Sequence, residues 1–335
     1  MKHLILKENY ESKLSLIETE LAIKFVKDNF ERELSRALNL TRVSAPLFVL
    51  PSTGLNDGLN GVERRVNFDI KNINEEVEVV QSLAKWKRNA LAKYGFNVGS
   101  GLYTDMNAIR RDEDLDSLHS AYVDQWDWEK IITKEDRKIP FLKQTVKKIY
   151  KVLCKVENSV CKKFPTLNKA LPDDIYFITT KQLENLYPNL TPSEREYEIC
   201  KKYRAVFIMQ IGAKLKNGLP HDGRAADYDD WNLNGDIMVY YEELDIAFEL
   251  SSMGIRVDEK SIVEQLKEKG EIDKINNPYV QGVINSTLPL TIGGGIGQSR
   301  LCMFMLKKAH IGEVQASVWS DDDIKALEAC NIHLL

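Results

Sequence analysis

The feature that most constrains the fold is the alternation of side chains in residues 125–129, which read Gln-Trp-Asp-Trp-Glu. Successive side chains of a β-strand point to opposite faces, so Gln125, Asp127 and Glu129 share one face. Trp126 and Trp128 share the other. A face of Gln, Asp and Glu is either solvated or lines a polar site, whereas two tryptophans indicate a core face. The segment therefore predicts a sheet with one apolar face and one polar face.

Other segments extend this sheet and surround it with helices. Strand-like patterns occupy residues 41–50, 66–70, 77–80, 101–109, 121–128, 205–212, 236–241, 247–257 and 291–298. Helical spacing predicts helices over residues 10–38, 82–94, 143–163, 261–269 and 301–308, with a further helix starting at Thr191. Ser15 and Glu18 form a possible capping box, which would start the first helix later than Tyr10.

Because several strands follow one another along the chain, we expect an α+β fold with a mainly antiparallel sheet flanked by helices. No composition shift or linker divides the sequence, so we expect a single domain over residues 1–335. The N-terminal helix, residues 1–40, should pack on the same body.

Composition narrows the class of protein without naming a function. The 335 residues carry 46 Lys and Arg against 50 Asp and Glu, a net charge of −4, which argues against a nucleic-acid partner. The five cysteines form no Cys-x-x-Cys pair. No apolar run approaches the ~20 residues that span a bilayer. We therefore expect a cytoplasmic protein with reduced thiols and no membrane partner.

An acidic stretch, residues 221–231, reads as a loop with four aspartates: Asp222, Asp227, Asp229 and Asp230. Asp236 and Glu249 follow on two successive predicted strands, which would place the two carboxylates side by side if the strands are neighbours. Carboxylates at this density suit Mg²⁺, which takes one or two of them together with the phosphates of a substrate. The alternative is a solvated acidic loop, since charge runs commonly face water.

Two further segments place arginines at sites suited to anions. Arg110 and Arg111 end the strand that precedes the polar face, and arginine offers a bidentate fork for phosphate or carboxylate. Residues 293–297 read Gly-Gly-Gly-Ile-Gly and lead to Arg300 at the start of an apolar helix. Glycines let a backbone and a flat ligand approach closely, although a tight strand-to-helix junction is the alternative. The sequence contains neither a P-loop nor a GxGxxG motif.

In this order, residues 42–46, 110–129 and 293–301 resemble the three motifs of class II aminoacyl-tRNA synthetases, most closely the aspartyl and asparaginyl branch. Longer blocks, residues 82–88, 122–129, 248–258 and 291–301, are similar to ammonia-dependent aspartate–ammonia ligases, the A-type asparagine synthetases. The resemblance implies a class II synthetase-like fold. It also implies ATP-dependent synthesis of L-asparagine from L-aspartate and ammonia through β-aspartyl-AMP, with release of AMP and pyrophosphate.

The same resemblance implies a homodimer, ATP with Mg²⁺ and no prosthetic group. Arg110 would hold the α-phosphate and the reacting carboxylate, and Arg300 the nucleotide. The synthetase pattern Arg-x-Glu is replaced here by Arg110-Arg111-Asp112-Glu113, so which arginine contacts the phosphate stays open. The resemblance also implies that the α-amino and α-carboxyl groups of the substrate are bound by Ser82, Lys87, Gln125 and Asp127. Mg²⁺–ATP would be bound by Asp236 and Glu249, and the adenine would contact Leu118 and Ser120. Asp57 and Asp222 would lie where ammonia arrives, and Ser252 would border the site.

Two other functions compete with this one. An aspartyl- or asparaginyl-tRNA synthetase paralogue would carry an anticodon-binding barrel before the catalytic body, but the residues before Pro46 read as helix. A non-catalytic regulator would have lost site charges, and Arg110, Asp236, Glu249 and Arg300 are all present. The ligase is therefore the favoured function.

Overall fold

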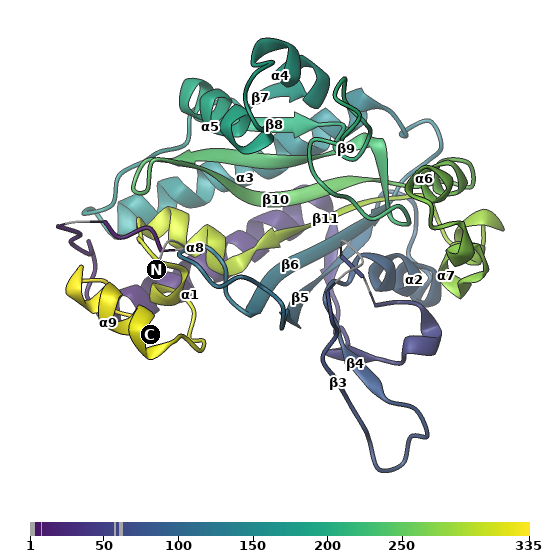
Figure 1. Cartoon of the computed structure of the whole chain (residues 1–335), viewed down its shortest axis with the longest axis horizontal. Helices are drawn as coiled ribbons and strands as arrows, with labels where there is room; N and C mark the ends of the chain where they lie inside the picture. The colour runs from purple at the N-terminus through teal and green to yellow at the C-terminus, as the bar shows by residue number, and fades with distance from the viewer. Residues whose placement is uncertain (1–3, 8, 57, 60–62) are drawn as a thin grey trace.

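The computed structural model describes residues 4–7, 9–56, 58–59 and 63–335. An eight-stranded sheet runs through it in the order β1-β5-β6-β11-β10-β9-β8-β7 (Figure 1). Its strands are β1 (Leu40–Arg42), β5 (Gly101–Ile109), β6 (Tyr122–Ile131), β7 (Tyr176–Thr179), β8 (Ala205–Met209), β9 (Asp229–Tyr241), β10 (Ile246–Arg256) and β11 (Thr291–Gly297). The neighbours from β5 to β8 are antiparallel, and only the edge pairs β1–β5 and β7–β8 are parallel. The prediction of a mainly antiparallel sheet is confirmed.

Helices cover the two faces of this sheet unequally. On one face, α1 (Leu16–Leu38), α3 (Ile139–Lys163) and α8 (Gln298–Leu306) pack into the main hydrophobic core, which contains Trp126 and Trp128. On the other face, α4 (Thr180–Leu186) and α5 (Pro192–Tyr203) cover the β7–β10 end of the sheet. The remaining helices are α2 (Ala84–Tyr94), α6 (Ser261–Lys269), α7 (Pro278–Ile284) and α9 (Asp321–Ala329). Because α2 packs on this face against β5, β6 and β11, the polar face stays open only between α2 and α5, over parts of β6, β11 and β10.

Helix α1 begins at Leu16, later than Tyr10, as the capping box indicated. The Ser15 hydroxyl accepts from the Glu18 amide at 3.3 Å, and the Glu18 carboxylate accepts from the Ser15 amide at 2.9 Å. Ile17 and Leu21, two of the apolar residues whose spacing predicted this helix, are exposed, with exposed fractions of 72% and 61%. Burial against α3 and α8 instead selects the stripe that includes Ala22, Val26 and Phe30.

Among the predicted strands, two differ most from the structure in their bounds. Residues 41–50 form β1 and a separate two-residue strand, β2 (Phe48–Val49), because Pro46 lacks the amide donor that a continuous ladder needs. β2 belongs to a small second sheet with β4 (Val77–Val79) and β3 (Asn67–Phe68), which projects from the body (Figure 1). β9 starts at Asp229 rather than Asp236, so the end of the acidic stretch is strand and not loop.

None of the helices among the described residues is both long and apolar enough to cross a membrane.

Candidate active site

The glycines of β11 let the polar side chains of β6 lie across it. The register pairs Gly293 with Glu129, Gly295 with Asp127 and Gly297 with Gln125. A Cβ on Gly293 would overlap the Glu129 carboxylate, and a Cβ on Gly295 would overlap Gln125 Oε1 and lie 2.9 Å from Asp127 Oδ1. A larger residue at either position would therefore force these polar side chains to move, whereas glycine lets them lie across β11. The tight-junction alternative accounts for neither contact.

A buried ion pair lies at the centre of this face. Lys87 Nζ is 2.9 Å from Asp127 Oδ2 and donates to the Gly294 carbonyl at 3.0 Å. The two side chains are only 1% and 4% exposed. Asp127 Oδ1 is buried and makes no hydrogen bond, so it is available to accept from a cationic group of a ligand. Ser82 lies beside this pair, and its hydroxyl accepts from the Ala84 amide at 3.1 Å. The helix predicted to start at Ser82 begins at Ala84, with Leu83 as its N-cap.

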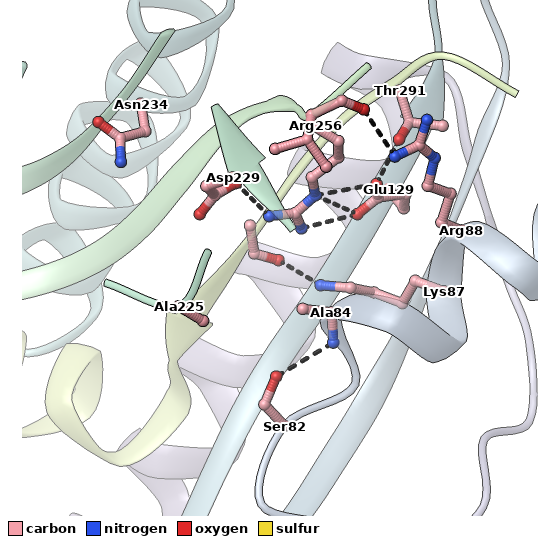
Figure 2. Close-up of polar contacts among 12 residues, drawn as sticks. Ser82, Ala84, Lys87, Arg88, Glu129, Ala225, Asp229, Asn234, Arg256 and Thr291 are labelled. Atoms are coloured by element: carbon pink, nitrogen blue, oxygen red, sulfur yellow. Dashed lines mark hydrogen bonds and ion pairs between the residues drawn. The ribbon is translucent and has the colours of Figure 1, made fainter. Parts of the chain in front are cut away.

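Arg256 is a buried residue of the site that the sequence analysis missed. Its guanidinium lies between Glu129 and Asp229 (Figure 2). Nη2 donates to Glu129 Oε2 at 2.7 Å, and Thr291 Oγ1 donates to Glu129 Oε1 at 2.6 Å. Although burial opposes the charged form, these carboxylates hold the pKa of Arg256 well above its ordinary value. The sequence did carry a signal for it: residues 252, 254 and 256 alternate along one predicted strand, so Arg256 shares a face with Ser252.

The acidic stretch is not a solvated loop. Three of its aspartates are buried and paired: Asp227 with Lys85 at 2.9 Å, Asp229 with Arg256, and Asp230 with Arg137 at 2.8 Å. Only Asp222, with 61% of its side chain exposed, faces solvent. The solvated alternative is wrong for the other three because a cationic partner from another element compensates each desolvated carboxylate.

Arg110 and Arg300 lie near the start of β6, away from Glu129 and Arg256 near its end. Arg300 Nη1 donates to the Glu249 carbonyl at 3.1 Å, and Nη2 lies 2.7 Å from His119 Nε2. A guanidinium only donates, so His119 Nε2 accepts and the proton on Nδ1 faces Asp116 at 2.9 Å. Arg110 Nε is buried without a hydrogen-bond partner, whereas Arg111 Nη1 reaches the Arg65 carbonyl at 3.5 Å. This geometry favours Arg110 as the anion-binding arginine.

Asp236 and Glu249 share the polar face because of a β-bulge. Ser252 pairs with Asp236 but Glu249 pairs with Met238, and the register shifts between Glu249 and Ser251. The extra residue returns Glu249 to the face of Ser252. Burial raises the pKa of Asp236 to about 7; Arg224 opposes this rise and Glu249 adds to it. The two carboxylates are thus close enough to interact, as the strand prediction required.

A cavity of about 440 Å³ opens over this face. It is lined by eleven of the residues that the resemblance implicated: Ser82, Lys87, Arg110, Leu118, Ser120, Gln125, Asp127, Asp222, Glu249, Ser252 and Arg300. Asp236 is not among the lining residues, because it lies buried beside Arg224. Asp57 falls outside the described residues. A second cavity of about 280 Å³ shares Arg110, Asp222 and Ser252 with the first and is also lined by Arg224.

Comparison with solved structures defines the class of fold. The chain is similar to the asparaginyl-tRNA synthetase from Pyrococcus horikoshii, solved with asparaginyl-adenylate, with a TM-score of 0.65 and 13% identity over 90% of this chain and 70% of that one. It is also similar to the aspartyl-tRNA synthetase from Entamoeba histolytica, with a TM-score of 0.61 and 14% identity over 91% and 59% of the two chains. At such identities the likeness concerns the fold alone. It confirms the class II synthetase-like catalytic fold.

Sequence comparison identifies the family. The family model of aspartate–ammonia ligase matches residues 17–331. The chain is 61% identical to the aspartate–ammonia ligase of Ruminiclostridium cellulolyticum over all of both chains. It is 60% identical to that of Fusobacterium nucleatum over 97% of this chain and 99% of the relative. The chain therefore belongs to the aspartate–ammonia ligase family, and the expected assignment to an ATP-dependent ligase is confirmed.

Proposed function

We propose that the chain forms L-asparagine from L-aspartate, ammonia and ATP in the cavity over β6, β11 and β10, through β-aspartyl-AMP. The observation that supports this best is one cavity that is lined by Arg110, Arg300, the Lys87–Asp127 pair and Glu249. A cavity of this kind offers partners for phosphates, for an amino acid's α-groups and for a metal. Family membership supports the same reaction.

In the first step, a β-carboxylate oxygen of aspartate attacks the α-phosphorus of ATP, and pyrophosphate leaves. Such a displacement mainly needs alignment of the reacting groups and neutralisation of phosphate charge. We assign neutralisation to Arg110 and Arg300. Lys87 would bind the α-carboxylate, and the free Asp127 Oδ1 would accept from the α-ammonium group, with Ser82 and Gln125 beside them. This assignment leaves the β-carboxylate directed toward Arg110.

In the second step, ammonia attacks the β-carbonyl carbon, AMP leaves, and the nitrogen loses a proton. Asp222 lines both cavities and is largely exposed, so it can take part on the side from which ammonia arrives. Asp57 is assigned to the same side from the family resemblance. The adenine would lie near Leu118 and Ser120, which also line the cavity.

Asp236 and Glu249 fit a role in holding Mg²⁺ with the phosphates of ATP. Asp236 Oδ1 is buried without a hydrogen-bond partner, and Glu249 reaches the cavity with 41% of its side chain exposed. Among the described residues no three His, Cys, Asp or Glu side chains converge as a preformed metal cluster. Two carboxylates suffice for Mg²⁺ when phosphates and water supply its other ligands. When bound, the ion would offset phosphate charge.

We also propose a cytoplasmic homodimer. The exposed apolar residues Ile17 and Leu21 on α1, and Leu47 beside β2, support a second copy as their cover. The five free cysteines are consistent with a reducing compartment. Light scattering at several concentrations tests the dimer, and a Leu21→Glu variant that remains dimeric would exclude this part of α1 from the interface.

The test of the reaction follows pyrophosphate and asparagine together, with ATP, Mg²⁺ and L-aspartate, with and without ammonium. Ammonium-dependent pyrophosphate matched by asparagine supports the ligase. Aspartate-dependent ATP–pyrophosphate exchange without asparagine would reveal an acceptor other than ammonia. The absence of exchange would exclude aspartate activation altogether.

The paired variants Arg110→Gln and Arg111→Gln test the choice of arginine. Of these two arginines, only Arg110 lines the cavities. We therefore expect its substitution to lower kcat/KM by about 10²-fold, the usual scale for one charge-stabilising donor. Arg111→Gln should stay within about threefold of the wild type, because its guanidinium contacts the Arg65 carbonyl at 3.5 Å outside the cavity. The reverse result would transfer the phosphate contact to Arg111.

A further inference from the structure

Arg224 lies among the carboxylates that we assign to Mg²⁺–ATP. Its Nη1 is 2.6 Å from Asp222 Oδ2, and its Nη2 forms an ion pair with Asp236 Oδ2. Glu249 is near enough for its charge to act on the same guanidinium. Only 13% of the Arg224 side chain is exposed, against 9% for Asp236. One side-chain cation thus pairs with two of these carboxylates, Asp222 and Asp236.

The backbone that carries Arg224 is held from the opposite side. Lys269 Nζ donates to the Arg224 carbonyl at 2.9 Å, and Trp231 Nε1 donates to the Ala225 carbonyl at 3.1 Å. Gln265 Nε2 donates to the Ala226 carbonyl at 3.1 Å. A change of partner by the guanidinium is therefore confined to side-chain rotation, without movement of the segment.

Arg224 also has another place to bind. It lines the cavity of about 280 Å³ that adjoins the main cavity at Arg110 and Ser252. A triphosphate whose α-phosphate lies at Arg110 can extend its outer phosphates into this space. Arginine is well suited to pair with phosphate oxygens, and its long side chain allows it to exchange one anion for another.

We propose that Arg224 is a resident counter-cation that keeps metal binding conditional on the nucleotide: it occupies the Asp222–Asp236 carboxylates in the free enzyme and transfers to the outer phosphates when Mg²⁺–ATP binds. A divalent ion alone must displace this tethered cation. An ion that arrives with ATP brings phosphates that accept the guanidinium. The inference rests on the proposed ATP site and adds a positioning residue to it.

The experiment measures Mn²⁺ binding without nucleotide, by the loss of the free-ion electron paramagnetic resonance signal. If Arg224 occupies the carboxylates in most molecules, only the remaining fraction can bind Mn²⁺, and the apparent affinity is reduced by that fraction. Removal of the guanidinium ends this competition, so we expect Arg224→Gln to bind Mn²⁺ at least ~10-fold more tightly than the wild type. In EDTA, the same variant should bind ATP ~10-fold more weakly and AMP unchanged, because AMP lacks the outer phosphates.

Arg204→Gln is the matched control, because it removes a surface Arg–Glu242 pair of 2.8 Å on another part of the sheet. It should bind Mn²⁺, ATP and AMP as the wild type does. Mn²⁺ affinity that is unchanged or weaker in folded Arg224→Gln overturns the proposal, as does equal loss of ATP and AMP affinity. If that variant does not fold, Arg224→Lys decides: the ammonium lacks the two-pronged fork of the guanidinium and should hold the two carboxylates less tightly, so Mn²⁺ affinity should rise.

Asparagine formation by the wild type is measured on the same preparation. Its absence would contradict the proposed function whatever Mn²⁺ does. Its presence, with unaltered Mn²⁺ binding in the variants, would contradict only the role of Arg224.

Discussion

Substitution of Gly295 by alanine should damage aspartate use far more than ATP use. The new Cβ would overlap Gln125 Oε1 and lie 2.9 Å from Asp127 Oδ1, so both side chains must move. Restoring ordinary contact of ~3.5 Å requires a shift of about 1 Å at Gln125. A misplacement of that size costs up to about 10²-fold, so we expect kcat/KM for aspartate to fall about 10²-fold, or about 2.7 kcal/mol.

The assay is steady-state pyrophosphate release at saturating ammonium, varying aspartate and then ATP. The KM for ATP should stay within about twofold, because the Gly295 Cβ meets only the side chains assigned to the amino acid. Overpacking should also cost about 1–3 kcal/mol of stability, which urea unfolding measures separately. Gly282→Ala is the control, since its nearest neighbour is the Leu288 side chain at 3.0 Å outside the cavity. A folded Gly295→Ala enzyme that keeps wild-type kcat/KM for aspartate would refute the assignment of Gln125 and Asp127.

Three further predictions concern Glu129, Arg300 and His310. Glu129→Gln leaves Arg256 with Asp229 as its one remaining carboxylate, so the free energy of unfolding should fall by about 3–5 kcal/mol; an unchanged urea midpoint would show that the pair is not needed. Arg300→Lys loses the fork that joins His119 to the Glu249 carbonyl, so the KM for ATP should rise about tenfold while that for aspartate holds; equal changes in both would argue against a nucleotide role. Burial lowers the pKa of His310 from 6.5 to about 4, so the unfolded chain takes up a proton at higher pH than the native protein and stability should fall by about 3 kcal/mol as pH drops from 6.5 to 4. His310→Asn keeps an acceptor for the Gly312 amide and should reduce that pH dependence, and a slope equal to the wild type's would assign it to other groups.

Local spacing in the sequence was enough to predict much of the architecture. The Gln-Trp-Asp-Trp-Glu alternation separates the faces of β6 correctly, and the capping residues Ser15 and Thr191 start their helices as expected. These features depend on neighbours a few residues apart, whose geometry the backbone dictates. The glycines of β11 also indicated close approach, although not to which side chains. The reaction was predicted from the blocks of sequence that resemble the aspartate–ammonia ligases.

Contacts between distant segments decided what spacing left open. The bulge after Glu249 brings that carboxylate to the face of Asp236, and simple alternation from Ser252 would have placed it on the opposite face. Arg256 meets Glu129 across 127 residues of sequence, and packing against α3 and α8 selected which side of α1 is buried. Burial and charge pairing depend on which elements become neighbours, and local periodicity carries no information about that choice. Polar alternation was therefore visible in the sequence, whereas the partner of each buried charge was set by the tertiary structure.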